Sequence, residues 1–264
     1  MSERRPIVGG NWKMHGNRAH ARELLHALRA ALDDISDVEV VICPPTPWLG
    51  DAADTFDGGT LEIGAQNVYW EPDGTFTGEQ SAQMLTGTVS HVIIGHSERR
   101  RVFGETDEET NRKLRAVLDA GLTPILAVGE RREEREAGET TAVLERQLLA
   151  ALEGIDELPG NMVVAYEPVW AIGSGLAATA EIAQEAASAV RKVLGSRFNS
   201  EAAAAVRIQY GGSVSADNAS DFAELPDIDG ALVGAASLRT DEFAAICGAF
   251  AHAHRVATDS ESSP

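Results

Sequence analysis

The chain has 264 residues, of which 44% are hydrophobic and 24% are charged, so it is long enough and apolar enough to bury a core of its own. Its formal net charge is -19, because 41 acidic residues outnumber 22 basic ones. A surface of that sign argues against nucleic acid or an anionic membrane as a partner, since both attract basic faces.

We expect no membrane-spanning or targeting segment. No apolar run approaches the roughly 20 residues that a helix needs to cross a bilayer, and the residues after Met1 lack the apolar stretch of a signal peptide. Cys43 and Cys247 have no spacing typical of a disulfide framework or a metal site. The sequence therefore predicts a cytoplasmic protein that needs no metal or organic cofactor.

Arginine carries most of the positive charge, because lysine occurs only at Lys13, Lys113 and Lys192. An acidic, lysine-poor composition fits adaptation of the surface to salt, in which carboxylates keep a protein hydrated. It also fits a coding bias towards arginine and alanine. The composition leaves both interpretations open.

Short apolar runs alternate with longer helical patterns along the whole chain. Eight strands are predicted, at Pro6–Trp12, Val38–Cys43, Thr60–Gln66, His91–Gly95, Thr123–Val128, Met162–Glu167, Val206–Tyr210 and Gly230–Val233. Each run is nearly continuous, as strands covered on both faces require. Leucines recur every four residues in two of the intervening segments, at Leu24, Leu28 and Leu32 and at Leu144, Leu148 and Leu152. This spacing predicts helices with one apolar stripe against a sheet.

Eight strands that are each followed by a helix predict an α/β fold, a single (β/α)8 barrel. An open, doubly wound sheet is the alternative. It usually carries a Gly-x-Gly-x-x-Gly turn after its first strand, and this sequence has none there. We expect the barrel to occupy residues 1–254 and the polar segment 255–264 to be a disordered tail.

Polar residues stand where three of the predicted strands end. Asn11 and Lys13 follow the first strand, His96 follows the fourth, and Glu167 ends the sixth. Each alone could be structural: a surface lysine, a satisfied core histidine or an ion-paired glutamate. Because the active site of such a barrel lies at the carboxyl ends of its strands, their joint occurrence predicts a catalytic site.

Glycine-rich turns follow the last three strands. They read Ala171-Ile172-Gly173-Ser174-Gly175, Tyr210-Gly211-Gly212-Ser213 and Gly234-Ala235-Ala236-Ser237. Glycine lets backbone N–H groups approach a phosphate closely, and barrels commonly hold phosphate in the loops after strands seven and eight. We therefore expect a phosphate site, with Gly173, Ser213, Gly234 and Ala235 as its candidate residues.

These segments resemble the signature segments of the triosephosphate isomerase family, whose fold is the TIM barrel. The similarity rests on Asn11-Trp12-Lys13-Met14, Gly95-His96-Ser97-Glu98-Arg99-Arg100, Ala165–Gly173 and Tyr210–Ser213, which occur in the family's order, and it runs from about Pro6 to His252. The resemblance implies that the protein interconverts dihydroxyacetone phosphate and D-glyceraldehyde 3-phosphate through an enediolate, in glycolysis and gluconeogenesis.

The resemblance also implies a role for each candidate. Glu167 would abstract the carbon-bound proton, and a neutral His96 would polarise the carbonyl oxygen. Lys13 would stabilise the phosphate and the developing oxyanion, with Asn11 as a neutral donor nearby. Ser97 and Glu98 would support the site, Glu98 by orienting or balancing Lys13.

Two further segments carry expectations from the resemblance. The first is a mobile lid, formed by Pro168, Val169, Trp170, Ala171, Ile172, Gly173, Ser174, Gly175 and Leu176. The second is the loop Ala65–Glu79, whose aromatic residues imply a homodimer in which two subunits interlock. Thr77 on this loop would then approach the partner's active site.

The sequence departs from the family's usual pattern in four places. The lid tip carries Ser174 and Leu176 where a threonine and a basic residue are usual, and Ala235 replaces a glycine. His15 replaces an asparagine, and Ala127 occupies a place often held by cysteine. These changes leave two alternatives open. One is an isomerase of a four-carbon ketose phosphate, such as an erythrulose phosphate. The other is a barrel that binds phosphate without catalysis.

Overall fold

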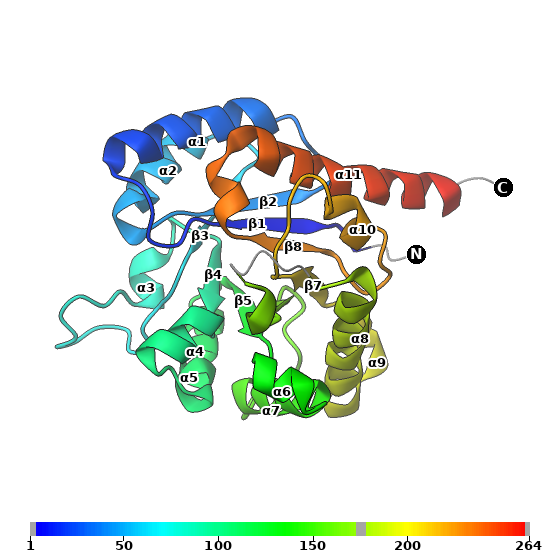
Figure 1. Ribbon diagram of the computed structural model, residues 1–264. Coiled ribbons are helices and arrows are strands. Elements are labelled where there is room, and N and C mark those ends of the chain that lie inside the picture. The colour runs from blue at the N-terminus through cyan, green and yellow to red at the C-terminus, as the bar shows by residue number, and fades with distance from the viewer. Residues whose placement is uncertain (1–3, 173–177, 262–264) are drawn as a thin grey trace.

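The structure, a computed structural model, describes residues 4–172 and 178–261, and at its centre eight parallel strands close into a barrel in chain order (Figure 1). The strands are β1 (Ile7–Asn11), β2 (Glu39–Cys43), β3 (Glu62–Ala65), β4 (His91–Ile94), β5 (Thr123–Val128), β6 (Val163–Tyr166), β7 (Arg207–Tyr210) and β8 (Gly230–Val233). The barrel closes where β8 pairs with β1, with Ile7 opposite Gly230. The predicted fold class and all eight predicted strands are confirmed.

Helices cover the outside of the barrel (Figure 1). They are α1 (Arg18–Leu32), α2 (Leu49–Phe56), α3 (Ala82–Leu85), α4 (Ser97–Phe103), α5 (Asp107–Asp119), α6 (Arg132–Glu136), α7 (Thr140–Ala151), α8 (Ala180–Arg197), α9 (Ser200–Ala205), α10 (Ala219–Ala223) and α11 (Thr240–Glu261). Short 3-10 helices occur at η1 (Thr46–Trp48), η2 (Val169–Ala171) and η3 (Ala235–Leu238). No helix in the described part of the chain is long and apolar enough to cross a bilayer.

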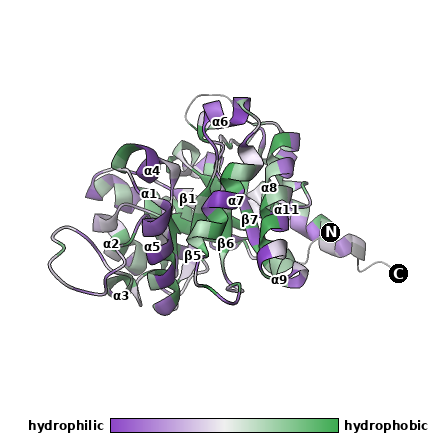
Figure 2. Cartoon of the chain, turned by 90° about the horizontal axis from the view of Figure 1, so that it is seen from below, coloured by the Kyte–Doolittle hydropathy of each residue, from purple (hydrophilic) through white to green (hydrophobic). Residues whose placement is uncertain are grey.

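The core consists of two layers because successive strand residues point to opposite faces. One set fills the inside of the barrel and comprises Ile7, Val41, Cys43, Ile93, Ile125, Ala127, Val163, Ala165 and Leu232. The alternate set, which includes Val8, Val40 and Ile42, packs under the helices. Figure 2 accordingly shows hydrophobic colour on the central strands and hydrophilic colour on the outer parts of helices such as α4 and α5.

Local sequence signals fix where several helices begin. Thr106 caps α5 in a capping box, in which its side chain accepts from the Glu109 N–H and the Glu109 carboxylate accepts from the Thr106 N–H. Asn17 and Thr179 cap α1 and α8 through their side-chain oxygens. Such caps contribute about 1 kcal/mol each to helix stability.

The C-terminal segment differs from its sequence prediction. Polar composition predicts a disordered tail from residue 255, whereas α11 continues to Glu261. Arg255 forms an ion pair of 2.6 Å with Asp37, and Ala257 is buried. One face of the helix therefore still packs on the barrel although the composition is polar.

Candidate active site

The strand-end residues predicted to be catalytic meet in one cavity at the mouth of the barrel. Its volume is about 360 Å³, and Asn11, Lys13, His96 and Glu167 all line it. The four come from the ends of β1, β4 and β6, so the closed barrel brings together groups that are far apart in the sequence.

The turn after β1 holds Lys13 in an unusual backbone conformation. Its φ is +53°, in the left-handed region that non-glycine residues rarely adopt. Two hydrogen bonds hold this turn: the Lys13 N–H donates to Asn11 Oδ1 (3.0 Å), and Gln66 Nε2 donates to the Lys13 carbonyl (2.9 Å). The Lys13 ammonium then reaches Glu98 Oε1 at 2.6 Å. The left-handed conformation of Lys13 costs about 1 kcal/mol or more of folding free energy, and the two hydrogen bonds of the turn hold it. In this conformation the ammonium lies at the cavity.

The same contacts define what Asn11 can do. It is 6% exposed, and its Oδ1 is engaged by the Lys13 N–H, so its amide NH2 is the part left for a ligand. Gln66 was not among the sequence candidates. The signal for it was only a polar residue directly after β3.

His96 is held as a hydrogen-bond donor. The Glu98 N–H donates to His96 Nδ1 (3.2 Å), so Nδ1 is the acceptor and the ring proton lies on Nε2. The preceding Gly95 has a φ of +68°, and it is fixed by Arg100 Nε, which donates to its carbonyl (2.7 Å), and by Glu105, which accepts from its N–H (3.2 Å). This orients Nε2–H towards the cavity.

Glu167 is almost fully buried, with 2% of its surface exposed. Its Oε1 lies 2.9 Å from His96 Nε2, and its Oε2 accepts from the Ser97 N–H at 2.8 Å. Glycines on both sides make room for it. A Cβ on Gly129 would lie 1.8 Å from the Glu167 carbonyl oxygen, and one on Gly211 would lie 2.9 Å from Glu167 Cγ. Any side chain at Gly129 would displace the candidate base, a role that was missed in the sequence.

Glu167 and His96 each shift the pKa of the other. Burial acts to raise the pKa of Glu167, but the charge and hydrogen bond of His96, the Ser97 N–H and Lys13 outweigh it, so the pKa is lowered. Burial acts to lower the pKa of His96, but the charge and hydrogen bond of Glu167 outweigh it and raise that pKa. Glu167 is therefore ionised and ready to accept a proton.

The protonation state of His96 depends on the protonation state of Glu167. The charge and hydrogen bond of the ionised Glu167 are the main influences that oppose the effect of burial on the pKa of His96, and the charge of Glu98 adds to them. Once Glu167 takes up a proton, burial favours the neutral imidazole. The Glu98 N–H at Nδ1 favours the neutral ring in every state.

The described ends of the predicted lid are anchored to the barrel. After β6, Trp170 Nε1 donates to Glu130 Oε1 (2.8 Å), which also accepts from the Tyr166 hydroxyl (3.1 Å). At the other end, the Ala178 N–H donates to the Tyr210 hydroxyl (3.1 Å). Burial raises the pKa of Glu130, which is fully buried.

Glu130 was not a sequence candidate. Its signal was a carboxylate directly after Gly129, the residue that follows β5. Pro168, Val169, Trp170, Ala171 and Ile172 lie in the described part of the lid. Gly173, Ser174, Gly175 and Leu176 lie outside the described residues.

The predicted phosphate residues line the same cavity where the structure describes them. Ser213, Gly234 and Ala235 are all in its wall. The Ser213 hydroxyl donates to the Ala171 carbonyl (2.7 Å), so it also ties the loop after β7 to the lid. A Cβ on Gly212 would lie 2.1 Å from the Tyr210 hydroxyl, which explains the glycine there.

The chain matches the family model described as triosephosphate isomerase over residues 6–250. It is 52% identical over 252 residues to a triosephosphate isomerase of Symbiobacterium thermophilum, covering 95% of this chain and 98% of that protein. It is 48% identical over 245 residues to one of Carboxydothermus hydrogenoformans, covering 92% and 98%. It is 47% identical over 245 residues to one of Rhodopirellula baltica, covering 92% and 96%.

Proposed function

The chain belongs to the triosephosphate isomerase family and interconverts dihydroxyacetone phosphate and D-glyceraldehyde 3-phosphate, and we propose that Glu167 is the base that moves the proton. The single observation that supports this most is the 2.9 Å contact between Glu167 Oε1 and His96 Nε2. It puts an ionised carboxylate and a hydrogen-bond donor on the same cavity, as proton transfer next to a carbonyl needs.

The proposed reaction moves one proton between two neighbouring carbons and another between their oxygens. The Glu167 carboxylate takes the proton from the hydroxymethyl carbon of dihydroxyacetone phosphate, and the C–H electrons form the double bond of the enediolate. The former carbonyl oxygen becomes an oxyanion, to which His96 Nε2–H and the Asn11 NH2 donate. The hydroxyl proton on the first carbon's oxygen then has to pass to this oxyanion, and His96 is the group placed to relay it. Glu167 returns its proton to the neighbouring carbon, and the first carbon is left as the aldehyde.

The resting position of Glu167 implies a movement before the first transfer. Both of its carboxylate oxygens are engaged, one by His96 and one by the Ser97 N–H. To reach a substrate carbon the carboxylate has to leave the His96 ring, and this frees Nε2–H for the substrate oxygen. One displacement thus prepares both the base and the donor.

Lys13 supplies the positive charge at the phosphate end. Its ammonium is paired with Glu98 and is only a quarter exposed, with Gly234 and Ala235 in the same cavity wall. A phosphate dianion placed there would meet a cation whose desolvation is already partly complete. We retain Gly173 as a phosphate ligand on the family resemblance alone.

The reaction belongs to glycolysis and gluconeogenesis, and we propose the cytoplasm as its location. The comparisons do not favour the two alternatives considered from the sequence, a tetrulose phosphate isomerase and a non-catalytic barrel.

Substrate preference is tested by steady-state assays of the purified protein on D-glyceraldehyde 3-phosphate and erythrulose 1-phosphate. We expect kcat/KM to be at least about a hundredfold higher for the triose, because the tetrulose carries an extra hydroxymethyl group that the active site of a triosephosphate isomerase has to accommodate. Equal or higher kcat/KM for the tetrulose would contradict the triose assignment. Ala235 would then be the first described residue to exchange for glycine.

We also propose that the protein is a homodimer through the loop Ala65–Glu79. This loop projects from the body of the molecule (Figure 1). It carries a cluster of aromatic rings in which Tyr69 stacks on Trp70 at 4.1 Å and contacts Phe76 at 4.6 Å. Phe76 is 39% exposed and the other two rings are half-buried, and aromatic surface on a projecting loop is typical of an interface.

A matching surface lies on the same chain beside the catalytic cavity. There, a further cavity of about 490 Å³ is lined by Lys13, His96, Met14 and Phe103. Met14 is 93% exposed and Phe103 is 71% exposed. The loop of one copy would cover these apolar side chains in the other, and so bring Thr77 towards the partner's Lys13.

The dimer proposal predicts the effect of a charge at Met14. We expect the unmodified protein to sediment at twice its chain mass of 28.0 kDa and Met14→Arg to sediment as a monomer, because the interface would bury an unpaired charge. Val256→Arg, at a position 55% exposed on α11, is the control and should stay dimeric. Analytical ultracentrifugation at micromolar concentration decides. An unmodified protein that is monomeric and fully active would contradict the proposal.

A further inference from the structure

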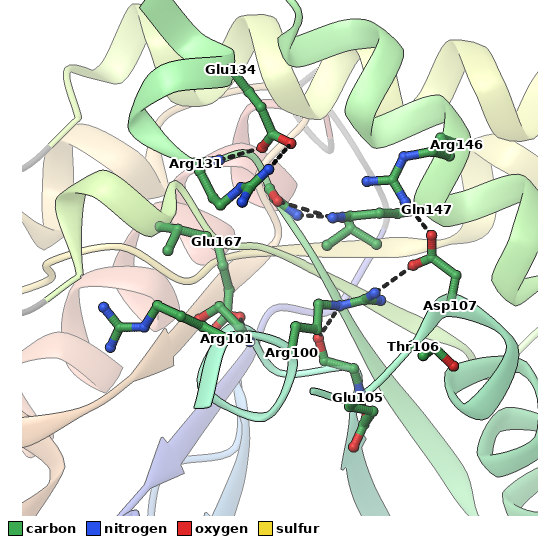
Figure 3. A pocket seen from close by; sticks show the side chains of 15 residues that line it. Arg100, Arg101, Glu105, Thr106, Asp107, Arg131, Glu134, Arg146, Gln147 and Glu167 are labelled. Carbon is green, nitrogen blue, oxygen red and sulfur yellow. Dashed lines mark hydrogen bonds and ion pairs between the residues drawn. The ribbon is translucent and has the colours of Figure 1, made fainter. Parts of the chain in front are cut away.

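A second cavity, of about 420 Å³, lies next to the catalytic one and shares Glu167 with it (Figure 3). Its wall comes from α4, the start of α5, the end of β5 and the loop after it, α6, α7, and the segment from Glu167 to Val169 after β6. Four arginines line it, Arg100, Arg101, Arg131 and Arg146, and we call it the arginine cavity. The proposed reaction assigns no chemistry to any guanidinium of this cavity.

Two carboxylates of the wall are paired with these arginines. Asp107 bridges two of them, at 2.5 Å from Arg100 Nη1 and in contact with Arg146 Nη1, and Glu134 lies 3.1 Å from Arg131 Nη2. Within the described part of the chain, Arg101 forms no hydrogen bond or ion pair. The four guanidinium groups thus have only these two carboxylates as ion-pair partners, which leaves an excess of two positive charges among them.

The other two carboxylates of the wall are Glu105 and Glu167, and two cations that lie outside the wall, Lys113 and Arg99, balance their charge. Glu105 binds Lys113 at 2.5 Å and Arg99 at 2.6 Å, and Glu167 binds His96 and the Ser97 N–H. Neither Lys113 nor Arg99 lines the cavity. The excess positive charge therefore stays in the cavity, on a chain whose net charge is -19.

The guanidinium groups keep free N–H donors at this site. Figure 3 shows Arg131 pointing into the space beneath Glu134, with Arg100 and Arg146 meeting at Asp107 on one side and Arg101 extending on the other. Arg131 is 66% exposed and Arg146 is 55% exposed, so most of their donors are open to a ligand. Planar guanidinium forks suit phosphate and carboxylate groups, which accept two parallel hydrogen bonds.

We propose that the arginine cavity binds a small anion with two phosphate or carboxylate groups. One group would lie between Arg101 and Arg131, and the other against Arg100 and Arg146. An anion with a single charged group would leave part of the excess charge unneutralised. Because Val169 also lines this cavity, the ligand would contact the chain two residues after the catalytic glutamate.

Pyrophosphate is a suitable probe, because it carries two phosphate groups and fits the cavity. Calorimetric titration at fixed low ionic strength is done on the Lys13→Ala variant, in which the catalytic phosphate site is impaired. We expect one pyrophosphate per chain to remain bound. Adding Arg101→Gln and Arg131→Gln should weaken this binding at least about tenfold. Adding Arg132→Gln instead, next to the cavity but outside its wall, should leave the affinity within about twofold.

Several results would overturn the proposal. They are absence of pyrophosphate binding to Lys13→Ala, unchanged affinity after loss of Arg101 and Arg131, and an equal loss in the Arg132→Gln control. Inorganic phosphate that binds as tightly as pyrophosphate would overturn the two-group ligand. In an otherwise unmodified chain, Arg101→Gln with Arg131→Gln should keep kcat within about twofold, so loss of this site and failure of the proposed catalytic roles are separately visible.

Discussion

Replacing Glu167 by aspartate is expected to lower kcat at least about 500-fold, which corresponds to roughly 4 kcal/mol of activation free energy. The aspartate carboxylate would withdraw by one methylene from the position where the substrate carbon has to lie. It would also lose the two contacts that place it now, to His96 Nε2 at 2.9 Å and to the Ser97 N–H at 2.8 Å. KM should change much less, because the phosphate end of the cavity is untouched.

The Glu167→Asp experiment needs a check on folding, since the residue is buried. Glu157→Asp makes the same chemical change at an exposed position and serves as the surface control. Circular dichroism and the urea midpoint should show that both variants are folded. Single-turnover measurements then separate the chemical step from product release. A Glu167→Asp variant with near-normal kcat would show that another group moves the proton.

The fold and the strand-end residues could be predicted because both follow from local patterns. Apolar runs of four to six residues form strands that are buried on both faces, and the barrel rule then places their polar ends together. Asn11, Lys13, His96 and Glu167 are therefore found in one cavity, as expected. The resemblance to the family supplied their roles, which periodicity alone could not give.

What could not be predicted depends on contacts between distant segments. Glu130 meets Trp170 40 residues later, and the need for glycine at Gly129 exists only because the Glu167 carbonyl lies against it. The helical end of α11 packs through Arg255, whose partner Asp37 is 218 residues away. A carboxylate, a glycine and an arginine are each common at a surface, so none of them signals its partner in advance.

The arginine cavity shows the same limit for charge. Arg100 lies on α4, Arg131 just before α6 and Arg146 on α7, and the last two have acidic neighbours in the sequence. The charges along α6 are mixed, as is typical of a solvated helix face, and the run of three arginines on α4 does not show by itself what those arginines face. Only the closed arrangement shows which carboxylates are already neutralised and which arginines are left over.

Replacing Lys13 by alanine is expected to remove detectable binding of the phosphorylated substrate and to lower kcat/KM at least about 1,000-fold, or about 4 kcal/mol. The Lys13 ammonium lies close to the Gly234 loop, since a Cβ on Gly234 would be only 3.6 Å from Lys13 Cε, and it lines the same cavity as Glu167 and His96. Its loss also leaves the Glu98 carboxylate unpaired beside the approaching phosphate. Substrate affinity by equilibrium dialysis and kcat/KM by coupled assay measure the effect.

The two causes of that loss can be separated by also removing the charge of Glu98. If repulsion from an unpaired Glu98 dominates, the double variant Lys13→Ala with Glu98→Gln should recover most of the affinity. If the ammonium itself binds the phosphate, the double variant should stay as weak as Lys13→Ala, and this is the result we expect. Lys192→Ala, on the exposed face of α8, is the matched control and should bind normally. An unchanged substrate affinity in Lys13→Ala would exclude Lys13 from the phosphate site and leave Arg239, which also lines this cavity, as the next cation to test.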